Sequence, residues 1–302
     1  MRIAANIFDS EDNKMTIDCH NHPNWFGMTA DKMVADMDAQ GIDKTWLLSC
    51  EIPESEYNLK EIGLIRSFST DTRNIPFEHC IEYAEKYPDR FILGYAPDPR
   101  LPYAIDRLKS AIDMYDVKIC GEVKYRMMAD NCDAIEMYRF CGEKGLPVVM
   151  HIQRPIAHGR EGDKREKYWF GGDIDAFERA IKLCSETTFI GHAQSFWSEI
   201  SGDGKAETEL YPKGEITPGG KLIRLLETYD NLYCDISAGS GRGALSRDPE
   251  FAIKFINKYQ DRILFARDDI KSLHKELLLS YNLDSQVLEK IFHKNAEKLI
   301  GE

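Results

Sequence analysis

Short apolar runs alternate with longer amphipathic segments along most of the chain. Eight of these runs are rich in Val, Ile, Leu and Phe and show little polar alternation, which predicts parallel strands buried on both faces. They are Met15–Cys19, Thr45–Ser49, Arg90–Tyr95, Val117–Val123, Pro147–His151, Thr188–His192, Leu232–Ile236 and Arg262–Ala266.

Segments with helical periodicity lie between these runs, and another follows the last one. Eight strands that each precede a helix predict an α/β fold of the (β/α)8 TIM-barrel type, with residues 1–302 as a single domain. A doubly wound open sheet is the lesser alternative. The predicted helices are Ala30–Gln40, Pro76–Lys86, Tyr103–Met114, Ala134–Lys144, Ile174–Cys184, Lys221–Thr228, Pro249–Lys258 and Ser272–Ile300.

The connections differ in length according to their direction. Helix-to-strand links such as Gly145–Leu146 are brief, whereas the strand-to-helix links are long and polar. In a barrel the strand-to-helix loops gather at one mouth, which is where chemistry takes place. The long links are Cys50–Ile75, Ile152–Gly172, Ala193–Gly220 and Ser237–Asp248.

Metal-competent side chains stand at this end of four predicted strands. His20 and His22 follow the first strand two residues apart, a spacing that puts both imidazoles on one face of an extended chain. Alone, the pair also fits an exposed turn. However, His151, His192 and Asp268 each end a further strand. This coincidence indicates a divalent-metal site at the mouth.

The composition limits the partners. The formal net charge of -12 disfavours nucleic acid and anionic membranes, although an anionic small substrate is still allowed. Neither a 20-residue apolar run nor a secretory signal is present. The eight cysteines show no CxxC pairing, which favours reduced thiols in the cytoplasm. A small-molecule substrate is the expected partner, and a homo-oligomer is compatible with the sequence.

These residues resemble the amidohydrolase superfamily, and more narrowly its branch related to aminocarboxymuconate semialdehyde decarboxylase. The resemblance covers nearly the whole chain. One departure is Ala266–Asp268, where that branch usually has Gly-Thr-Asp, and it bears on substrate specificity more than on metal binding. The matching segments are Ile17–His22, Leu146–His151, Ile190–His192 and Ile263–Asp268, supported by Lys86–Phe91 and Asn295–Ile300.

The resemblance implies roles for these side chains. His20, His22, His151 and Asp268 would hold one divalent ion, with zinc expected first and manganese or iron next. His192 would be a second-site ligand or a group that transfers protons and polarises a carbonyl. Asp268 would also act as general base toward water, and it is preferred to Asp269 because it directly follows the strand.

Glu122 and Lys124 share a face near the end of the fourth predicted strand. In binuclear relatives, a glutamate or a carbamylated lysine from about this strand bridges two metals. The alternatives for this pair are an internal ion pair and a lysine that awaits a substrate anion. One ion is therefore expected, and two if either residue bridges.

Arginines and aromatic residues in the mouth loops are candidates for substrate binding. Arg126, Arg154 and Arg242 favour an acidic substrate, since arginine suits carboxylates and phosphates. Trp25 is a candidate wall of the pocket. Other aromatic residues in these loops either line the pocket, pack the loops down or contact another subunit; they are Tyr168, Trp169, Phe170, Phe196 and Trp197.

Three functions are compatible with these residues. The first is a hydrolase that uses metal-activated water on an amide, lactone or ester of a small anionic substrate. The second is a non-oxidative decarboxylase of a small carboxylic acid, which would use the same ligands. The third is a non-catalytic metal-binding barrel, disfavoured because no part of the inner mouth is degraded.

Overall fold

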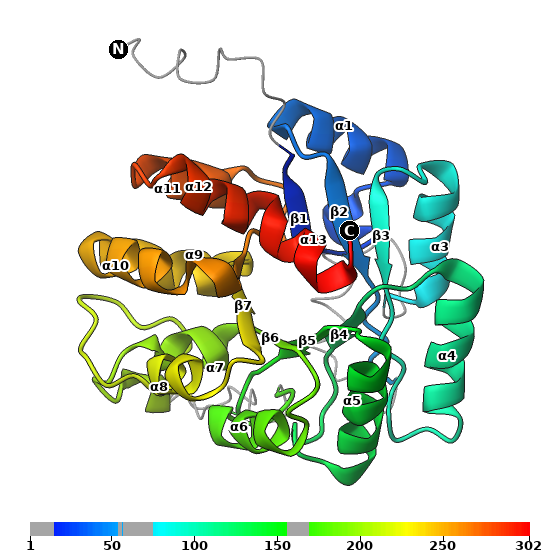
Figure 1. Ribbon diagram of the computed structural model, residues 1–302, viewed down its shortest axis with the longest axis horizontal. Helices are drawn as coiled ribbons and strands as arrows, with labels where there is room; N and C mark the ends of the chain where they lie inside the picture. The colour runs from blue at the N-terminus through cyan, green and yellow to red at the C-terminus, as the bar shows by residue number, and fades with distance from the viewer. Residues whose placement is uncertain (1–14, 54–55, 57–74, 156–168) are drawn as a thin grey trace, which may run out of the picture.

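Eight parallel strands form the centre of the computed structural model, which describes residues 15–53, 56, 75–155 and 169–302 (Figure 1). Hydrogen bonds between neighbouring strands give the orders β1-β2-β3 and β4-β5-β6-β7-β8. The strands are β1 Ile17–Asn21, β2 Lys44–Leu48, β3 Phe91–Gly94, β4 Cys120–Val123, β5 Val148–His151, β6 Phe189–His192, β7 Leu232–Asp235 and β8 Ile263–Leu264.

Backbone hydrogen bonds join the two sets of strands on both sides. Lys118 N–H donates to Leu93 O at 3.0 Å, which connects the approach to β4 with β3. Cys19 N–H donates to Phe265 O at 2.9 Å, which connects β1 with the chain after β8. The strands follow one another in sequential order, unlike the reversed order of a doubly wound sheet. The predicted TIM barrel is confirmed.

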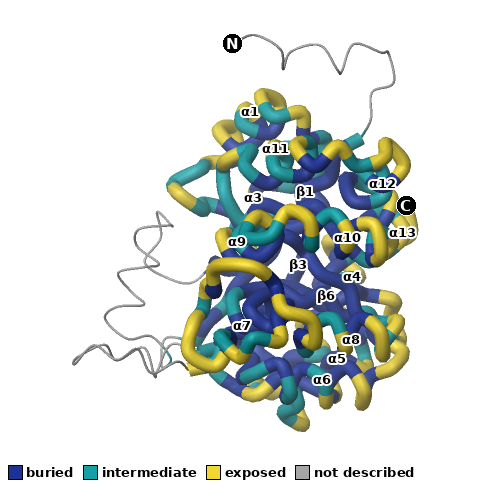
Figure 2. Tube along the Cα trace, turned by 90° about the vertical axis from the view of Figure 1, so that its left-hand side faces the viewer, coloured by how far each residue is buried: buried dark blue, intermediate teal, exposed yellow. Residues whose placement is uncertain are grey.

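The barrel interior is filled by apolar side chains. Most of the strands contribute to one buried cluster, and the tube in Figure 2 is buried along these strands and exposed on the outer helices. A larger apolar cluster separates the strands from the helices around them. The interior residues include Ile17, Cys19, Trp46, Leu48, Ile92, Ile119, Val149, Ile190, Tyr233 and Leu264.

Helices surround the strands, and capping residues start several of them. Asp173 accepts a hydrogen bond from Ala176 N–H at the start of α6, and Asp248 caps α10 in front of Pro249. The principal helices are α1 Ala30–Gln40, α3 Phe77–Lys86, α4 Ala104–Tyr115, α5 Cys132–Lys144, α6 Ile174–Leu183, α8 Lys221–Thr228, α9 Ala238–Ser246, α10 Pro249–Tyr259 and α11 Leu273–Ser280.

Shorter helical segments complete the described chain. They are η1 Trp25–Gly27, α7 Gln194–Trp197, η4 Ser198–Ile200, η5 Lys205–Glu207, η6 Gln260–Arg262, α12 Ser285–Glu289, η7 Lys290–Lys294 and α13 Asn295–Ile300. Of the helices in the described residues, none is long and apolar enough to cross a membrane.

Two expectations about the elements were wrong. The glycine-rich stretch Ser237–Asp248, expected to be a loop, contains α9. The single helix predicted for Ser272–Ile300 is divided among α11, α12, η7 and α13, because asparagine and aspartate at 282 and 284 interrupt it. Much of two other expected mouth loops, at positions 54–55, 57–74 and 156–168, lies outside the described residues.

Candidate metal centre

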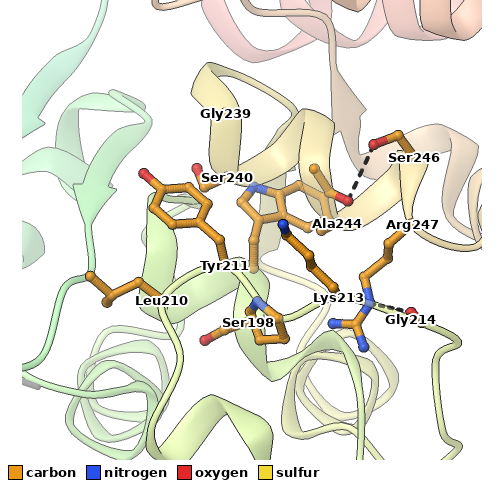
Figure 3. Close-up of a pocket in the computed structure, with 13 residues that line it drawn as sticks. Ser198, Leu210, Tyr211, Lys213, Gly214, Gly239, Ser240, Ala244, Ser246 and Arg247 are labelled. Atoms are coloured by element: carbon orange, nitrogen blue, oxygen red, sulfur yellow. Dashed lines mark hydrogen bonds between the residues drawn. The ribbon is translucent and has the colours of Figure 1, made fainter. Parts of the chain in front are cut away.

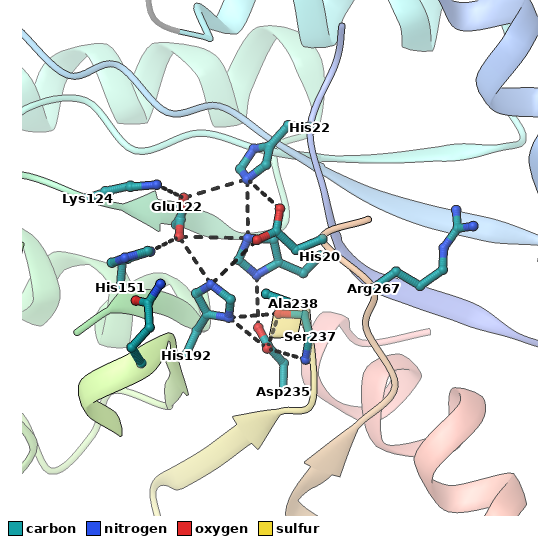
Figure 4. A network of polar contacts seen from close by, with 12 residues as sticks. His20, His22, Glu122, Lys124, His151, His192, Asp235, Ser237, Ala238 and Arg267 are labelled. Atoms are coloured by element: carbon teal, nitrogen blue, oxygen red, sulfur yellow. Dashed lines mark hydrogen bonds and ion pairs between the residues drawn. The ribbon is translucent and has the colours of Figure 1, made fainter. Parts of the chain in front are cut away.

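Imidazoles and carboxylates converge where the strands end at the mouth (Figure 4). His20 Nε2 lies 3.3 Å from His22 Nε2. Glu122 Oε1 lies 3.9 Å from His20 Nε2 and 3.6 Å from His192 Nε2. Asp268 also approaches two of these imidazoles, His22 Nε2 at 3.7 Å and His192 Nε2 at 3.8 Å. These five side chains form what we call the mouth cluster.

Irregular strand pairing coincides with two members of the mouth cluster. The register of β1 against β2 shifts between Asp18 and Asn21, and that of β4 against β5 shifts between Cys120 and Val123. His20 and Glu122 lie within these two shifts. Such irregularities redirect side chains and are frequent beside active sites, which explains how both residues reach the mouth cluster.

Asp235, at the end of β7, orients two imidazoles of the mouth cluster. Its Oδ2 lies 2.9 Å from His20 Nδ1, and its Oδ1 lies 3.0 Å from His192 Nδ1. Ser237 Oγ also lies 2.7 Å from His192 Nδ1. When each Nδ1–H donates to this carboxylate, both Nε2 atoms are left as electron-pair donors toward the interior of the site.

His22 is held in the same manner by a backbone group. Its Nδ1 lies 2.8 Å from Leu48 O, so that Nδ1–H donates and Nε2 faces the mouth cluster. His151 is placed differently, because its Nδ1 lies 2.7 Å from Glu122 Oε1 and its Nε2 lies 3.3 Å from Gln153 Oε1. The structure therefore sets His151 beside Glu122, at the edge of the mouth cluster.

Burial and neighbouring carboxylates together set the charges here. Burial lowers the pKa of His22 to about 3 and that of His151 to about 4, which favours neutral imidazoles that can bind a metal. For His20, although burial opposes it, the Asp235 carboxylate raises the pKa to about 9 in the metal-free protein. Burial also raises the pKa of the Asp268 carboxyl to about 6. Glu122 is different: although burial opposes it, Lys124 and His151 hold its pKa well below the usual range, so it stays a carboxylate.

The donor set fits a divalent cation. Glu122 Oε2 and Asp268 Oδ1 are buried and accept no hydrogen bond from the described residues, which is uncommon for buried carboxylate oxygens. Two overlapping groups, His20–Glu122–His192 and His20–His22–Asp268, bring ligand atoms within 4.8 Å of one another. Imidazole nitrogen and carboxylate oxygen are ligands for zinc, manganese and iron.

The sequence left the role of Lys124 open, and the structure places this residue at the outer side of Glu122. Its Nζ is 4.0 Å from Glu122 Oε2 and 5.5 Å from the centre of the Phe170 ring. Trp25 also borders the mouth cluster: its ring centre is 5.3 Å from that of His22, and its Nε1–H donates to Asp268 O at 3.3 Å. Both residues thus contact members of the mouth cluster directly.

The predicted arginines lie farther out, and two of them contact protein groups. Arg154 forms an ion pair with Glu207 at 2.9 Å, and its other guanidinium nitrogen donates to Ala206 O. Arg126 donates to the backbone carbonyl of Glu56. Arg242 lies in α9, half-buried, and makes no ion pair with the described residues.

Of the aromatic residues in the mouth loops, Phe196 and Trp197 are buried, so they pack their loop down. Phe170 is also buried, and its ring meets that of His151 edge to face at 5.6 Å. Tyr168 lies outside the described residues.

A separate pocket of about 420 Å³ adjoins this region beside α9 (Figure 3). Trp197 lines it, and the same indole donates to Asp235 O at 2.9 Å. No histidine, aspartate or glutamate lines this pocket within the described chain. It offers hydroxyl and cationic groups from Tyr211, Lys213 and Ser240, so its chemistry differs from that of the mouth cluster.

Sequence reasoning missed Asp235 and Ser237. Both belong to the seventh apolar run or directly follow it, and Asp235 is fully buried. A single carboxylate at the C-terminal end of a predicted strand is the same signal that identified Asp268. It was overlooked because the apolar residue Ile236 follows Asp235 and made the run look continuous.

The Amidohydrolase family model matches residues 17–301, which is nearly the whole chain. The chain belongs to the amidohydrolase family. The predicted family is confirmed, and with it the expectation that the protein is an enzyme. No curated protein matches this amidohydrolase in sequence.

Several solved structures share the fold of this amidohydrolase. An uncharacterised TIM-barrel protein from Bordetella bronchiseptica is 17% identical, with 95% of this chain and 98% of that chain covered and a TM-score of 0.63. A dihydroxybenzoic acid decarboxylase from Polaromonas, solved with manganese and 2-nitroresorcinol, is 13% identical, with coverages of 95% and 97% and a TM-score of 0.60. A probable 2-pyrone-4,6-dicarboxylic acid hydrolase from Acinetobacter baumannii, with bound citric acid, is 10% identical, with coverages of 95% and 99% and a TM-score of 0.57. At these identities, the likeness concerns the fold.

Proposed function

We propose that this amidohydrolase is a metal-dependent hydrolase that acts on an amide, lactone or ester of a small anionic substrate. The observation that carries the proposal is the Asp268 carboxylate. One of its oxygens is buried without a hydrogen-bond donor among the described residues, and it lies 3.7 Å from the imidazole of His22. A carboxylate in this position suits proton transfer from water.

His20, His22, Asp268 and either His151 or Glu122 would hold the ion, which we expect to be zinc because the ligand set is rich in histidine. Manganese is the main alternative, and the Polaromonas decarboxylase was solved with it. When bound, such an ion supplies Lewis acidity toward a carbonyl oxygen and toward water. Asp235 and Leu48 O orient the imidazoles for this role, since each accepts a hydrogen bond from an Nδ1–H group.

The chain's own groups would carry the proton. Asp268 takes a proton from the attacking water as the new carbon–oxygen bond forms, and it returns that proton to the leaving nitrogen or oxygen as the scissile bond breaks. His192 Nε2, 3.8 Å from Asp268 Oδ2, would polarise the substrate carbonyl from the other side.

Decarboxylation is the second candidate, and the placement of Lys124 favours it. Its ammonium group lies beside both Glu122 and the ring of Phe170, so it could receive the carboxylate of a planar substrate. Several solved structures with this fold are dihydroxybenzoate decarboxylases. Hydrolysis ranks first because Asp268 supplies a buried base for water.

The experiment is a substrate panel combined with metal analysis. Purified protein, dialysed and supplemented in turn with zinc, manganese and iron, is assayed against lactones, amides and esters of small carboxylic acids and against aromatic carboxylates. Hydrolysis that requires bound metal and is lost in Asp268→Asn supports the proposal. Release of CO2 without hydrolysis would replace it with the decarboxylase. Substoichiometric metal under every condition would overturn both.

We also propose that the enzyme works in the cytoplasm. All eight cysteines occur as free thiols in the described part of the chain, and all but Cys132 are buried. Labelling of the native and denatured protein with a thiol reagent tests the reduced thiols on which this proposal rests: most should react, and only after denaturation.

A further inference from the structure

Arg267 occupies the position at which this chain departs from the pattern expected for its branch. The difference suggested altered substrate specificity, but the side chain is 1% exposed and extends away from the mouth cluster (Figure 4). It cannot contact a substrate from there. The role of Arg267 must therefore lie within the protein. This residue directly precedes Asp268 in the sequence, and its side chain lies behind the mouth cluster.

The guanidinium of Arg267 pairs with a fully buried carboxylate of β1. Arg267 Nε donates to Asp18 Oδ2 at 2.8 Å, and Arg267 N–H donates to Asp18 Oδ1 at the same distance. Asn21 Nδ2 also donates to Asp18 Oδ2, at 3.1 Å. At its outer end the guanidinium pairs with Asp36 of α1 at 2.7 Å. We call Asp18, Asn21 and Arg267 the β1–β8 clamp.

The clamp borders the backbone of Asp268 on both sides. On one side, the backbone N–H of Arg267 donates to Asp18 Oδ1. On the other side, Asp269 O accepts a hydrogen bond from Asn21 Nδ2 at 3.0 Å. Between them, Asp268 N–H donates to His20 O at 2.8 Å. Asp268 itself has a φ of 46°, in the left-handed region that non-glycine residues rarely occupy. Its conformation therefore depends on contacts with its neighbours.

We propose that Arg267 is a positioning residue that sets the carboxylate of Asp268 against the imidazoles of β1, and that metal affinity depends on it. This inference rests on the proposed metal centre. A planar guanidinium can satisfy Asp18 and Asp36 in fixed directions, which a lysine ammonium cannot do. Because buried ion pairs contribute little net stability, we assign the clamp to geometry: it joins the strand that carries His20 and His22 to the turn that carries Asp268.

The test measures metal affinity directly, by titrating the metal-free protein with zinc against a chromophoric chelator. Arg267→Met should weaken zinc binding by roughly ten- to a hundredfold, the range for residues that orient metal ligands. Arg267→Lys keeps the charge without the planar guanidinium, so its zinc affinity should lie between those of Arg267→Met and wild type. Within the clamp, Asp36→Asn changes only the outer contact of the guanidinium, so it should have the smallest effect on zinc affinity.

Arg262 provides a matched control at the other end of β8. Its guanidinium donates to Tyr229 O at 2.9 Å and Leu226 O at 2.6 Å, and neither carbonyl belongs to the mouth. Arg262→Met therefore loses comparable hydrogen bonds and should lower the melting temperature without changing zinc affinity. The double variant Asp18→Asn/Arg267→Met removes the unpaired buried charge, so it should fold better than Arg267→Met and still bind zinc weakly.

The outcomes separate the clamp from the metal centre. Weak zinc binding in both Arg267→Met and the double variant, with normal binding in Arg262→Met, supports the clamp. Wild-type affinity in a folded Arg267→Met or double variant overturns the clamp and leaves the metal centre standing. If Arg267→Met does not fold, the double variant decides in the same way. Failure of the wild type to bind zinc, manganese or iron overturns the metal centre and the clamp together.

Discussion

Polar groups at the two ends of the barrel differ in their hydrogen bonding. At the end where strands begin, arginines satisfy backbone carbonyls: Arg90 donates to Asp43 O and Ile42 O, and Arg262 donates to Tyr229 O and Leu226 O. At the mouth, buried oxygens of Glu122 and Asp268 accept no hydrogen bond from the described residues. These carbonyls at the strand-starting end thus have side-chain donors, whereas the two carboxylate oxygens at the mouth are left available as ligand atoms.

This contrast shows where the protein gives up stability for chemistry. Unsatisfied buried polar groups are unfavourable, so two buried carboxylate oxygens without donors beside the imidazoles of the mouth indicate a function there rather than a packing role. It also gives a criterion for individual residues. Substitutions at the strand-starting end should change folding alone, whereas substitutions at the mouth should change metal binding or turnover more than folding.

Asp268→Asn should have the largest effect. Loss of the proposed base should lower kcat/KM by about a hundredfold to ten-thousandfold, the usual contribution of a general base. The metal-free variant should nevertheless be at least as stable as wild type, because burial disfavours the Asp268 charge. Asp269→Asn is the control, since among the described residues the Asp269 carboxylate accepts a hydrogen bond only from Ile270 N–H. Equal losses in both variants would contradict the assignment of the base.

The same residue predicts a pH dependence of stability in the metal-free protein. The pKa of Asp268 rises from 3.8 to about 6 on folding, so between these values the folded state holds a proton that the unfolded state releases. The free energy of unfolding should therefore decrease as pH rises from about 4 to 6 in the wild type relative to Asp268→Asn. Denaturant titrations of both proteins across this range would measure the difference, and parallel curves would refute it.

Asp235→Asn should have the next largest effect. A carboxylate accepts from both His20 Nδ1 and His192 Nδ1, but an amide has only one acceptor oxygen, so one imidazole loses its orienting partner. Zinc affinity should fall roughly ten- to a hundredfold. Asp203 is paired with Arg247 outside the mouth cluster, so Asp203→Asn should leave zinc affinity unchanged. Chelator competition on wild type, Asp235→Asn and Asp203→Asn measures these zinc affinities, and equal affinities would contradict the prediction.

These effects also show what the sequence could and could not predict. The eight strands and most of the ligand-type residues were predictable, because buried parallel strands have an apolar signature and His20, His22, His192 and Asp268 stand where it stops. The pairing of His151 with Glu122, rather than with the other imidazoles, was not predictable. It depends on the register shift in β4, which leaves no pattern in the sequence.

The orienting residues were hidden for a related reason. Asp18, Asp235 and Arg267 lie within apolar runs or directly after them, where a polar residue is easily read as the end of a strand. Their roles depend on which strands are neighbours: Asp18 meets Arg267 only because β1 and β8 lie side by side in the closed barrel. Closure itself is a property of all eight strands and cannot be assigned to a local motif.

Arg90→Met should affect stability alone. Its guanidinium donates to two backbone carbonyls and pairs with the exposed Asp38 at 2.7 Å. Loss of these contacts should lower the free energy of unfolding by about 1–3 kcal/mol, as expected when hydrogen-bonded partners are left unsatisfied. Zinc affinity and kcat/KM at a temperature below unfolding should match wild type. A change in affinity would break the distinction between the two ends of the barrel.

Arg242→Gln should have the smallest effect and provides the finest test of this distinction. Unlike those of Arg90 and Arg262, the Arg242 side chain makes no ion pair or hydrogen bond within the described chain, and it lies in α9, the helix that follows Ser237 at the mouth. If it binds the substrate anion, its loss should raise KM several-fold and leave kcat and the melting temperature unchanged, since the interaction is equal in the ground and transition states. Arg154→Gln is the comparison, because Arg154 is already paired with Glu207 and should have a smaller effect on KM. A larger effect for Arg154 would mean that the substrate displaces that ion pair, and that a satisfied arginine at the mouth can still serve binding.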